Sequence, residues 1–446
     1  MSIRAMMPRL LAADLLLCVS CAGVSCARAP GVDANGSVPP LRSGPDADVS
    51  RGNVVAYARG KWWDGARFVE DTRYVESGFF VARPRQQPEE TVDLQGRFVV
   101  PPFGDAHNHM AGPVAAFDVA AVGAGVFYFM NPNVMASAAP ALRSFLSRPD
   151  RVDATLSMGG ITAPGGHPEK LYQDTLIKYV YTSMKPEQMV GDAFHYVTEE
   201  RDIEPTLDRL VSQNADFIKI FLLFSEDYAQ RKDDAASRGS KGLDPRLVSP
   251  IVAAAHRRGL RVAAHIETAA DFRTIVAAGV DEAAHLPGYV ALEDPIDKYV
   301  ITEDDATAAA KAHIVVVTTA WLGGMTRDAK ARLNAVQDMQ RSNIAKLQRA
   351  GVRLILGTDG DADGVVVKEA PYLVHLGVLD AASALRLLAV DTPRYIFPER
   401  RIGALSPGYE ASFIALEDDP IADVGNLAKI DRRVKQGVSL DAPADR

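Results

Sequence analysis

One pattern recurs through the middle of the chain: a helical segment ends at a glycine, and a short apolar strand follows at once. The three clearest copies are IVAAAHRRG before LRVAAHIET, TAADFRTIVAAG before VDEAAHLPG, and NIAKLQRAG before VRLILGTDG. Strands that alternate with helices of this length predict βα units and a parallel sheet. Residues 102–400 have the length that eight such units need, so we predict an α/β fold centred on a (β/α)8 TIM barrel.

A polar residue follows or ends each of these three strands. These residues are His265, His285 and Asp359. Barrel active sites lie at the carboxyl ends of the strands, where side chains from different βα units meet. The pattern therefore predicts that these three side chains belong to one site.

Two further segments place candidate ligands at strand ends. In VVPPFGDAHNHM, residues 99–110, His107 and His109 are two positions apart, so on an extended strand both rings would point to one side. Taken alone, this stretch is equally compatible with a polar turn. In ADFIKIFLLFS, Lys219 would be covered on both faces of a barrel strand, which is costly for a lone ammonium group.

Six residues thus stand in order at the ends of apparent strands: His107, His109, Lys219, His265, His285 and Asp359. Their motifs, DAHNH, DFIKI, AAHIE, EAAHL and LGTDG, resemble the amidohydrolase superfamily, in the branch with two metal ions bridged by a carboxylated lysine. Within it, the chain is most similar to the prolidase-like and imidazolonepropionase-like subgroup, over residues 52–437. Two positions depart from the commoner motif: Pro102 replaces a glycine, and Gly104 replaces an aliphatic residue.

The resemblance implies two metal sites with these ligands: His107, His109 and Asp359 for one ion, His265 and His285 for the other, and Lys219 bridging both. Neutral imidazole and carboxylate oxygen suit zinc and similar divalent cations, so we expect two such ions, with Zn²⁺ favoured. Carbon dioxide bound to Lys219 as a carbamate would supply the bridging anion. Asp359 would orient a metal-activated bridging hydroxide and carry its proton to the leaving group.

Single members of this set could also have structural roles. A lone His265 or His285 would more often be a hydrogen-bonded core histidine. Asp359, in TDGDADG, could belong to a turn or a calcium-like loop, although the glutamate of an EF-hand is missing. His167, in GGITAPGGHPEK, is a candidate catalytic residue that contacts substrate, because a Gly-Gly-His loop does so in the prolidase-like branch; an ordinary loop turn is the alternative.

The set favours a hydrolase that cleaves the C–N bond of a small amide, dipeptide or cyclic amide. A lactonase or phosphoesterase that uses the same binuclear site is the alternative. A non-catalytic exported binding protein would be expected to have lost a ligand, and a single-metal deaminase would lack the lysine. The net charge of −8, without an arginine-rich run, disfavours a nucleic-acid partner. We therefore expect a small-molecule substrate as the partner. The sequence does not decide whether the protein forms an oligomer.

Residues 1–26 are predicted to be a signal peptide, because two arginines precede an apolar run that is too short to span a bilayer. All cysteines of the chain lie here: Cys18, Cys21 and Cys26. Val-Ser before Cys21 resembles a bacterial lipoprotein box, and cleavage near Ala27 or Ala29 is the alternative. We therefore expect export to the periplasm, either as a free protein or as a lipoprotein with a lipid anchor at Cys21.

The remaining segments flank the predicted barrel. Residues 27–50 are rich in proline, glycine and small polar residues, which indicates a linker. Residues 51–101 and 401–437 are β-rich and punctuated by glycine, so we predict a small β-sandwich domain built from both ends. No segment after the leader is long and apolar enough to predict a membrane span.

Overall fold

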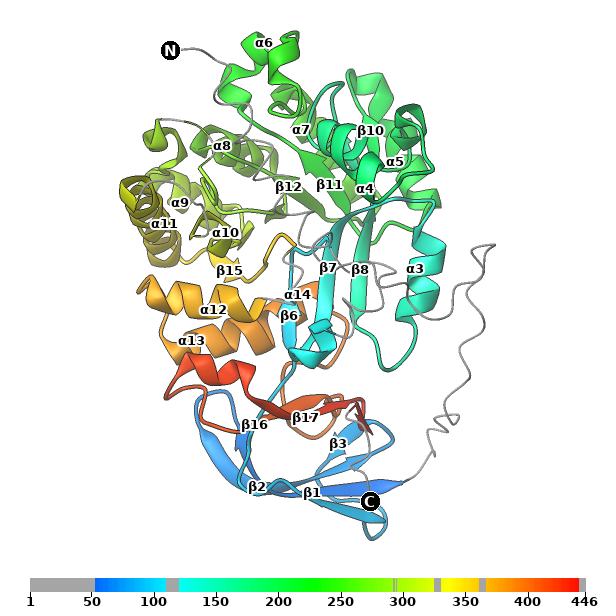
Figure 1. Ribbon diagram of the computed structural model, residues 1–446, viewed down its shortest axis with the longest axis vertical. Coiled ribbons are helices and arrows are strands. Elements are labelled where there is room, and N and C mark those ends of the chain that lie inside the picture. The colour runs from blue at the N-terminus through cyan, green and yellow to red at the C-terminus, as the bar shows by residue number, and fades with distance from the viewer. Residues whose placement is uncertain are drawn as a thin grey trace.

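The computed structural model describes residues 53–109, 120–291, 293, 295–324, 330–360 and 366–440. The predicted signal peptide (1–26), the linker (27–50) and Cys21 lie outside these described residues. Within them, parallel strands surrounded by helices form the larger part and a separate sheet forms the smaller part, which confirms the mixed α/β fold (Figure 1). No helix in the described part of the chain combines the length and the apolar character needed to cross a membrane.

Two parallel sheets form the centre of the larger part. The first has the order β6 (Phe103–Asp105), β7 (Val126–Val134) and β8 (Asp153–Met158). The second has the order β10 (Phe194–Tyr196), β9 (Gly160–Thr162), β11 (Ile218–Phe221), β12 (Val262–His265), β13 (Glu282–Ala283), β14 (Val315–Val317) and β15 (Arg353–Ile355). Every strand pair in both sheets is parallel, as the repeated βα pattern predicts.

Regular strand pairing does not close these two sheets into one ring. Backbone hydrogen bonds outside regular ladders join them at two places: the Ala106 amide donates to the Leu356 carbonyl, and the Asp216 amide donates to the Leu156 carbonyl, both at 2.9 Å. Among the described residues, no ladder joins β6 to β15 or joins β8 to a strand of the second sheet. The closed barrel therefore stays a prediction.

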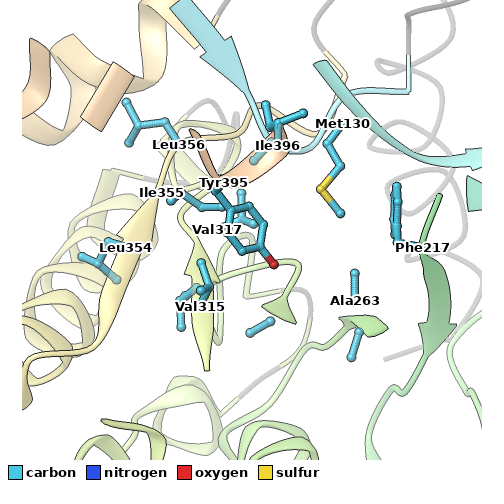
Figure 2. Packing of buried hydrophobic residues seen from close by; sticks show 14 of the residues in the cluster. Met130, Phe217, Ala263, Val315, Val317, Leu354, Ile355, Leu356, Tyr395 and Ile396 are labelled. Carbon is cyan, nitrogen blue, oxygen red and sulfur yellow. The ribbon is translucent and has the colours of Figure 1, made fainter. Parts of the chain in front are cut away.

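Helices cover the parallel strands on the outside (Figure 1). They are α3 (Ala139–Leu146), α5 (Ile203–Ser212), α7 (Pro245–Arg257), α8 (Ala269–Ala278), α9 (Glu303–Lys311), α11 (Lys330–Ala350), α12 (Val366–His375), α13 (Ala381–Arg386) and α14 (Thr392–Ile396), with the shorter α4 (Ile177–Tyr179), α6 (Tyr228–Arg231) and α10 (Trp321–Gly324). The helix predicted to end at Gly279 is confirmed, since Gly279 has a φ of 74° and caps α8, whose Phe272 and Ile275 are buried. Figure 2 shows buried side chains of the core between strands and helices, among them Met130, Val317 and Tyr395.

The β-rich ends of the chain pair in one eight-stranded sheet. Its strands are β1 (Val54–Trp63), β2 (Phe68–Glu76), β3 (Phe79–Val81), β4 (Glu90–Asp93), β5 (Phe98–Val100), β16 (Phe413–Leu416), β17 (Ile430–Lys435) and β18 (Val438–Ser439). The antiparallel pair β5–β16 joins the two ends, and Trp62, Phe80 and Phe413 pack into one aromatic core (Figure 1). Because β1 pairs with both β4 and β5, all strands belong to a single sheet, and the predicted two-sheet sandwich is not confirmed.

Asp153 on β8 links the parallel strands to the C-terminal segments. Its Oδ1 lies 2.6 Å from the Lys435 ammonium, and its Oδ2 lies 2.7 Å from the Arg400 guanidinium. The Lys435 side chain is 2% exposed. Removing one partner of a buried ion pair leaves the other charge desolvated and uncompensated.

Asp153→Ala is therefore expected to lower the free energy of unfolding by about 2–4 kcal/mol, measured by urea denaturation. The control is Asp338→Ala, which removes an exposed ion pair with Arg341 and should cost less than about 1 kcal/mol. Equal losses in the two variants would show that the Asp153 contacts do not stabilise the fold.

Candidate metal centre

Three of the predicted side chains converge beyond the carboxyl ends of β6, β13 and β15. His107, His285 and Asp359 each offer one ligand atom, and these atoms all lie within 4.8 Å of one another. Nε2 of His107 is 3.3 Å from Oδ1 of Asp359, and Nε2 of His285 is 4.0 Å from Oδ2 of the same carboxylate. This spacing is suited to a single cation between two imidazoles and a carboxylate.

His109 joins this group from the solvent side. Its Nε2 lies 3.2 Å from Nε2 of His107 and 3.3 Å from Oδ1 of Asp359, and its side chain is 36% exposed. Residues 106–109 follow β6 without strand structure, so the two rings do not lie on one face of an extended strand. The rings still converge, since the His107 carbonyl accepts hydrogen bonds from the amides of Thr358 (3.2 Å) and Asp359 (2.7 Å).

His265 and Lys219 lie beside the triad. The ring centroids of His265 and His285 are 4.7 Å apart, and Nε2 of His265 is 3.1 Å from Oε1 of Glu267. Because Glu267 engages Nε2, Nδ1 is the His265 nitrogen that can serve as a ligand. Lys219 is on β11 as predicted and is buried, and its Nζ has no hydrogen-bond partner among the described residues.

Burial controls the charge of these groups. Burial, together with the nearby Lys219 ammonium, lowers the pKa of His107 to about 3. Burial also places the pKa of His285 well below its usual value. Burial lowers the pKa of Lys219 to about 8, although Asp359 and Glu282 oppose this shift. The imidazoles of His107 and His285 are therefore neutral near neutral pH, which is the form that binds metal ions.

Two buried nitrogen atoms without a hydrogen-bond partner among the described residues show whether these residues fit two metal ions and a bridging carbamate. Nζ of Lys219 and Nε2 of His285 are buried without a hydrogen-bond partner in the described part of the chain. An unsatisfied buried polar atom costs about 1–3 kcal/mol. A cation on the imidazole nitrogen and a carboxylate on the lysine nitrogen would satisfy both atoms, so the residues fit these groups.

His167 lies against this site. Its ring stacks on that of His265 with centroids 4.8 Å apart and an angle of 20° between planes. Burial lowers the pKa of His167 to about 4, so the ring is neutral. The loop is held by its contacts with neighbours: the His167 amide donates to the Lys241 carbonyl at 2.8 Å, and Glu169 accepts from the Gly165 amide at 2.6 Å. The predicted location is observed, and the contact with substrate stays a prediction.

Asp105 is a site residue that the sequence pattern did not single out. It is fully buried at the end of β6. Oδ1 accepts from the amides of His107 and Thr358, both at 3.1 Å, and Oδ2 accepts from the side chains of Asn108 (2.9 Å) and Thr358 (2.6 Å). Asp105 thus fastens the loop that carries His107 to the loop that carries Asp359. The only sequence signal that could have identified Asp105 was its position two residues before His107.

Asp271 fastens a second pair of loops. Its carboxylate accepts from the amides of Phe224 (3.0 Å) and Ser225 (2.7 Å) after β11, and from the Glu267 amide (3.0 Å) after β12. It also accepts a hydrogen bond from the Thr268 amide at the start of α8. Asp271 thus fastens the loops that follow β11 and β12, and the direct pairing of these two strands sets Lys219 relative to His265.

Two glycines permit close approach of backbones at the site. A Cβ at Gly357 would lie 2.5 Å from Val317 and 2.9 Å from the Cβ of His107, so the glycine before Thr358 lets the His107 loop pack closely. A Cβ at Gly104 would lie 2.9 Å from Pro393 on α14. The departure from the usual aliphatic residue at Gly104 is thus explained by the proline that occupies its space.

Comparisons with known proteins agree with this arrangement. A family model described as the amidohydrolase family matches residues 177–440. Ochratoxinase of Aspergillus niger is 27% identical over 182 residues, which are 40% of this chain and 37% of that protein. The chain therefore matches little more than a third of the length of this curated relative.

Solved structures share the fold at low sequence identity. A Xaa-Pro dipeptidase with bound methionine in its active site has a TM-score of 0.68 and 19% identity, over 87% of this chain and 99% of that one. The crystal structure of A. niger ochratoxinase has a TM-score of 0.67 and 17% identity, over 88% of this chain and 96% of that one. Similarity at these identities shows the fold alone.

Proposed function

This chain belongs to the amidohydrolase family, and from that premise we propose that it hydrolyses the C–N bond of a small amide. The observation that carries the proposal is the convergence of His107, His285 and Asp359 within 4.8 Å at the strand ends. The proposed substrates are dipeptides and N-acyl amino acids, because the relatives include a Xaa-Pro dipeptidase and an ochratoxinase.

The proposed site holds two divalent cations, with zinc as the favoured metal. His107, His109 and Asp359 would bind one ion, His265 and His285 would bind the other, and a carbamate formed from carbon dioxide on Lys219 would bridge them. When bound, the cations activate a water molecule and polarise the substrate carbonyl. Burial of Lys219 supports the bridge, since it favours the neutral amine that reacts with carbon dioxide.

Asp359 is the proposed proton carrier. An amide nitrogen is a poor leaving group, so it needs a proton as the C–N bond breaks. The Asp359 carboxylate would take a proton from the attacking water and deliver it to this nitrogen. Its place between His107 and His285, with 13% of the side chain exposed, supports this role, because water can reach the carboxylate.

The finer architecture is also a proposal. The backbone bonds from Ala106 to Leu356 and from Asp216 to Leu156 support a ring of parallel strands, which is the (β/α)8 barrel over residues 102–400. The eight-stranded sheet supports a small β domain from residues 51–101 and 401–437.

The test of the function is a substrate screen with purified, zinc-supplemented protein. Dipeptides, N-acyl amino acids, simple lactones and phosphoesters are compared by kcat/KM. We expect at least one amide to be cleaved faster than any lactone or phosphoester. Lactone turnover that exceeds every amide would favour the lactonase alternative at the same site.

His167→Asn is expected to lower kcat/KM by about tenfold to a thousandfold, the scale of losing one well-placed hydrogen-bond donor. The physical reason is that His167, stacked on His265, would donate to the substrate oxygen. Metal content should stay unchanged, because His167 is not a proposed ligand. An unchanged kcat/KM on the best amide would mean that His167 is part of an ordinary loop turn.

Export is proposed from the leader pattern in residues 1–26. In a Gram-negative host, the mature protein is expected outside the cytoplasm, beginning at or beyond Cys21. Intact-mass measurement of fractionated cells gives the start and any lipid mass, and Cys21→Ser separates a lipoprotein from a free periplasmic protein. Protein that retains Met1 and fractionates with the cytoplasm would contradict export.

A further inference from the structure

Glu369 is a fully buried carboxylate on α12 that contacts none of the proposed metal ligands in the described structure. Its Oε1 accepts the Ala320 amide at 2.9 Å, and its Oε2 accepts the Trp321 amide at 2.7 Å. Both amides belong to the segment that follows β14. A buried carboxylate that uses both oxygens on neighbouring amides fixes the path of that backbone.

Thr319 directly precedes these two amides and has an unusual backbone conformation. Its φ is 42°, in the left-handed region that a β-branched residue rarely adopts. Such a conformation persists only where the surroundings enforce it. Glu369 holds the backbone after Thr319 by accepting from the Ala320 and Trp321 amides. Gln340 holds the same backbone, because its Nε2 donates to the Ala320 carbonyl at 3.0 Å.

The side chain of Thr319 holds His285. Its Oγ1 lies 3.0 Å from Nδ1 of His285, so this contact engages Nδ1 and leaves Nε2 for a metal ion. Tyr289 stacks on the His285 ring, with centroids 4.0 Å apart and 13° between planes. The ring is therefore held in tilt and position, with Nε2 on the side of Asp359.

We propose that Glu369 is a positioning residue for the metal centre, which acts through the left-handed Thr319 to hold His285 as a metal ligand. The inference rests on the proposed function, because it requires that His285 binds a metal. Partners that orient a ligating histidine commonly change metal affinity by about 10–100-fold.

The experiment measures zinc affinity of the metal-free full-length protein by competition with a chromophoric chelator. Thr319→Val removes the hydroxyl at nearly constant shape, and Thr319→Ser keeps it. We expect Thr319→Val and Glu369→Gln to weaken zinc binding at the site that includes His285 by about 10–100-fold, and Thr319→Ser to stay within about threefold of wild type. The control, Asp380→Asn, alters an exposed carboxylate at the start of α13 and should change nothing.

The double variant Glu369→Gln/Thr319→Val tests the connection between the two residues. If Glu369 acts through Thr319, the double variant loses no more affinity than the more strongly affected single variant. If the affinity losses of the two single variants multiply in the double variant, Glu369 does not act through Thr319. If folded Glu369→Gln binds zinc with wild-type affinity, the inference is wrong while the proposed function still stands. Should Glu369→Gln fail to fold, Thr319→Val with wild-type affinity would overturn the inference equally. A wild-type protein that binds no zinc would overturn both the inference and the proposed function.

Discussion

Lys219→Ala is expected to yield a folded protein that binds little metal and has lost about 10³-fold or more of its turnover. The lysine nitrogen is buried in the strand interior without a hydrogen-bond partner in the described residues. Without the proposed carbamate, two cations a few ångströms apart would repel each other with no anion between them. Elemental analysis and kcat on the best amide measure the two losses.

The matched control is Lys219→Met, which keeps most of the side-chain volume but cannot be carboxylated. Both variants should lose metal and turnover, whereas only the alanine variant leaves space for a small anion. Acetate or propionate is therefore expected to restore part of the activity of Lys219→Ala and none of that of Lys219→Met. Full metal loading and wild-type turnover in Lys219→Ala would refute the bridge.

Asp359→Asn is expected to lower kcat by about 10²–10⁴-fold, the usual cost of removing a general acid–base group. KM should change little, because the proton is transferred in the transition state. Asparagine is the suitable replacement for two reasons: it matches the size of aspartate, and it tolerates the left-handed conformation of this residue, whose φ is 58°.

Metal content must be measured beside the rate, because the neutral amide of the Asp359→Asn variant would be a weaker ligand than the carboxylate. Rates are therefore compared per bound metal. A rate within a factor of a few of wild type, on any substrate found, would remove Asp359 from the mechanism and leave it a ligand only.

The sequence predicted the parts of the site that the βα pattern controls. Carboxyl ends of parallel strands meet at one edge, so residues that end strands, such as His285 and Asp359, could be placed together from periodicity. The burial of Lys219 was predictable in the same way, because a central strand is covered on both faces.

The remaining parts depend on contacts between distant segments, which periodicity does not contain. Asp105 and Thr358 are 253 residues apart in the chain, yet their side chains lie within hydrogen-bond distance. Thr319 has a left-handed conformation that its residue type disfavours, and only Glu369 and the packing around it explain this. The pairing of β1 with both β4 and β5 likewise joined the predicted sandwich strands into one sheet.

The most direct test of the central claim is the metal content of the purified protein, determined by elemental mass spectrometry together with turnover before and after chelation. The site predicts about two divalent ions per chain, as in two-metal hydrolases, loss of turnover when they are removed, and its recovery when zinc is returned. A protein that carries no metal after incubation with zinc, and that cleaves its amide substrate equally well in the presence of a chelator, would contradict the account.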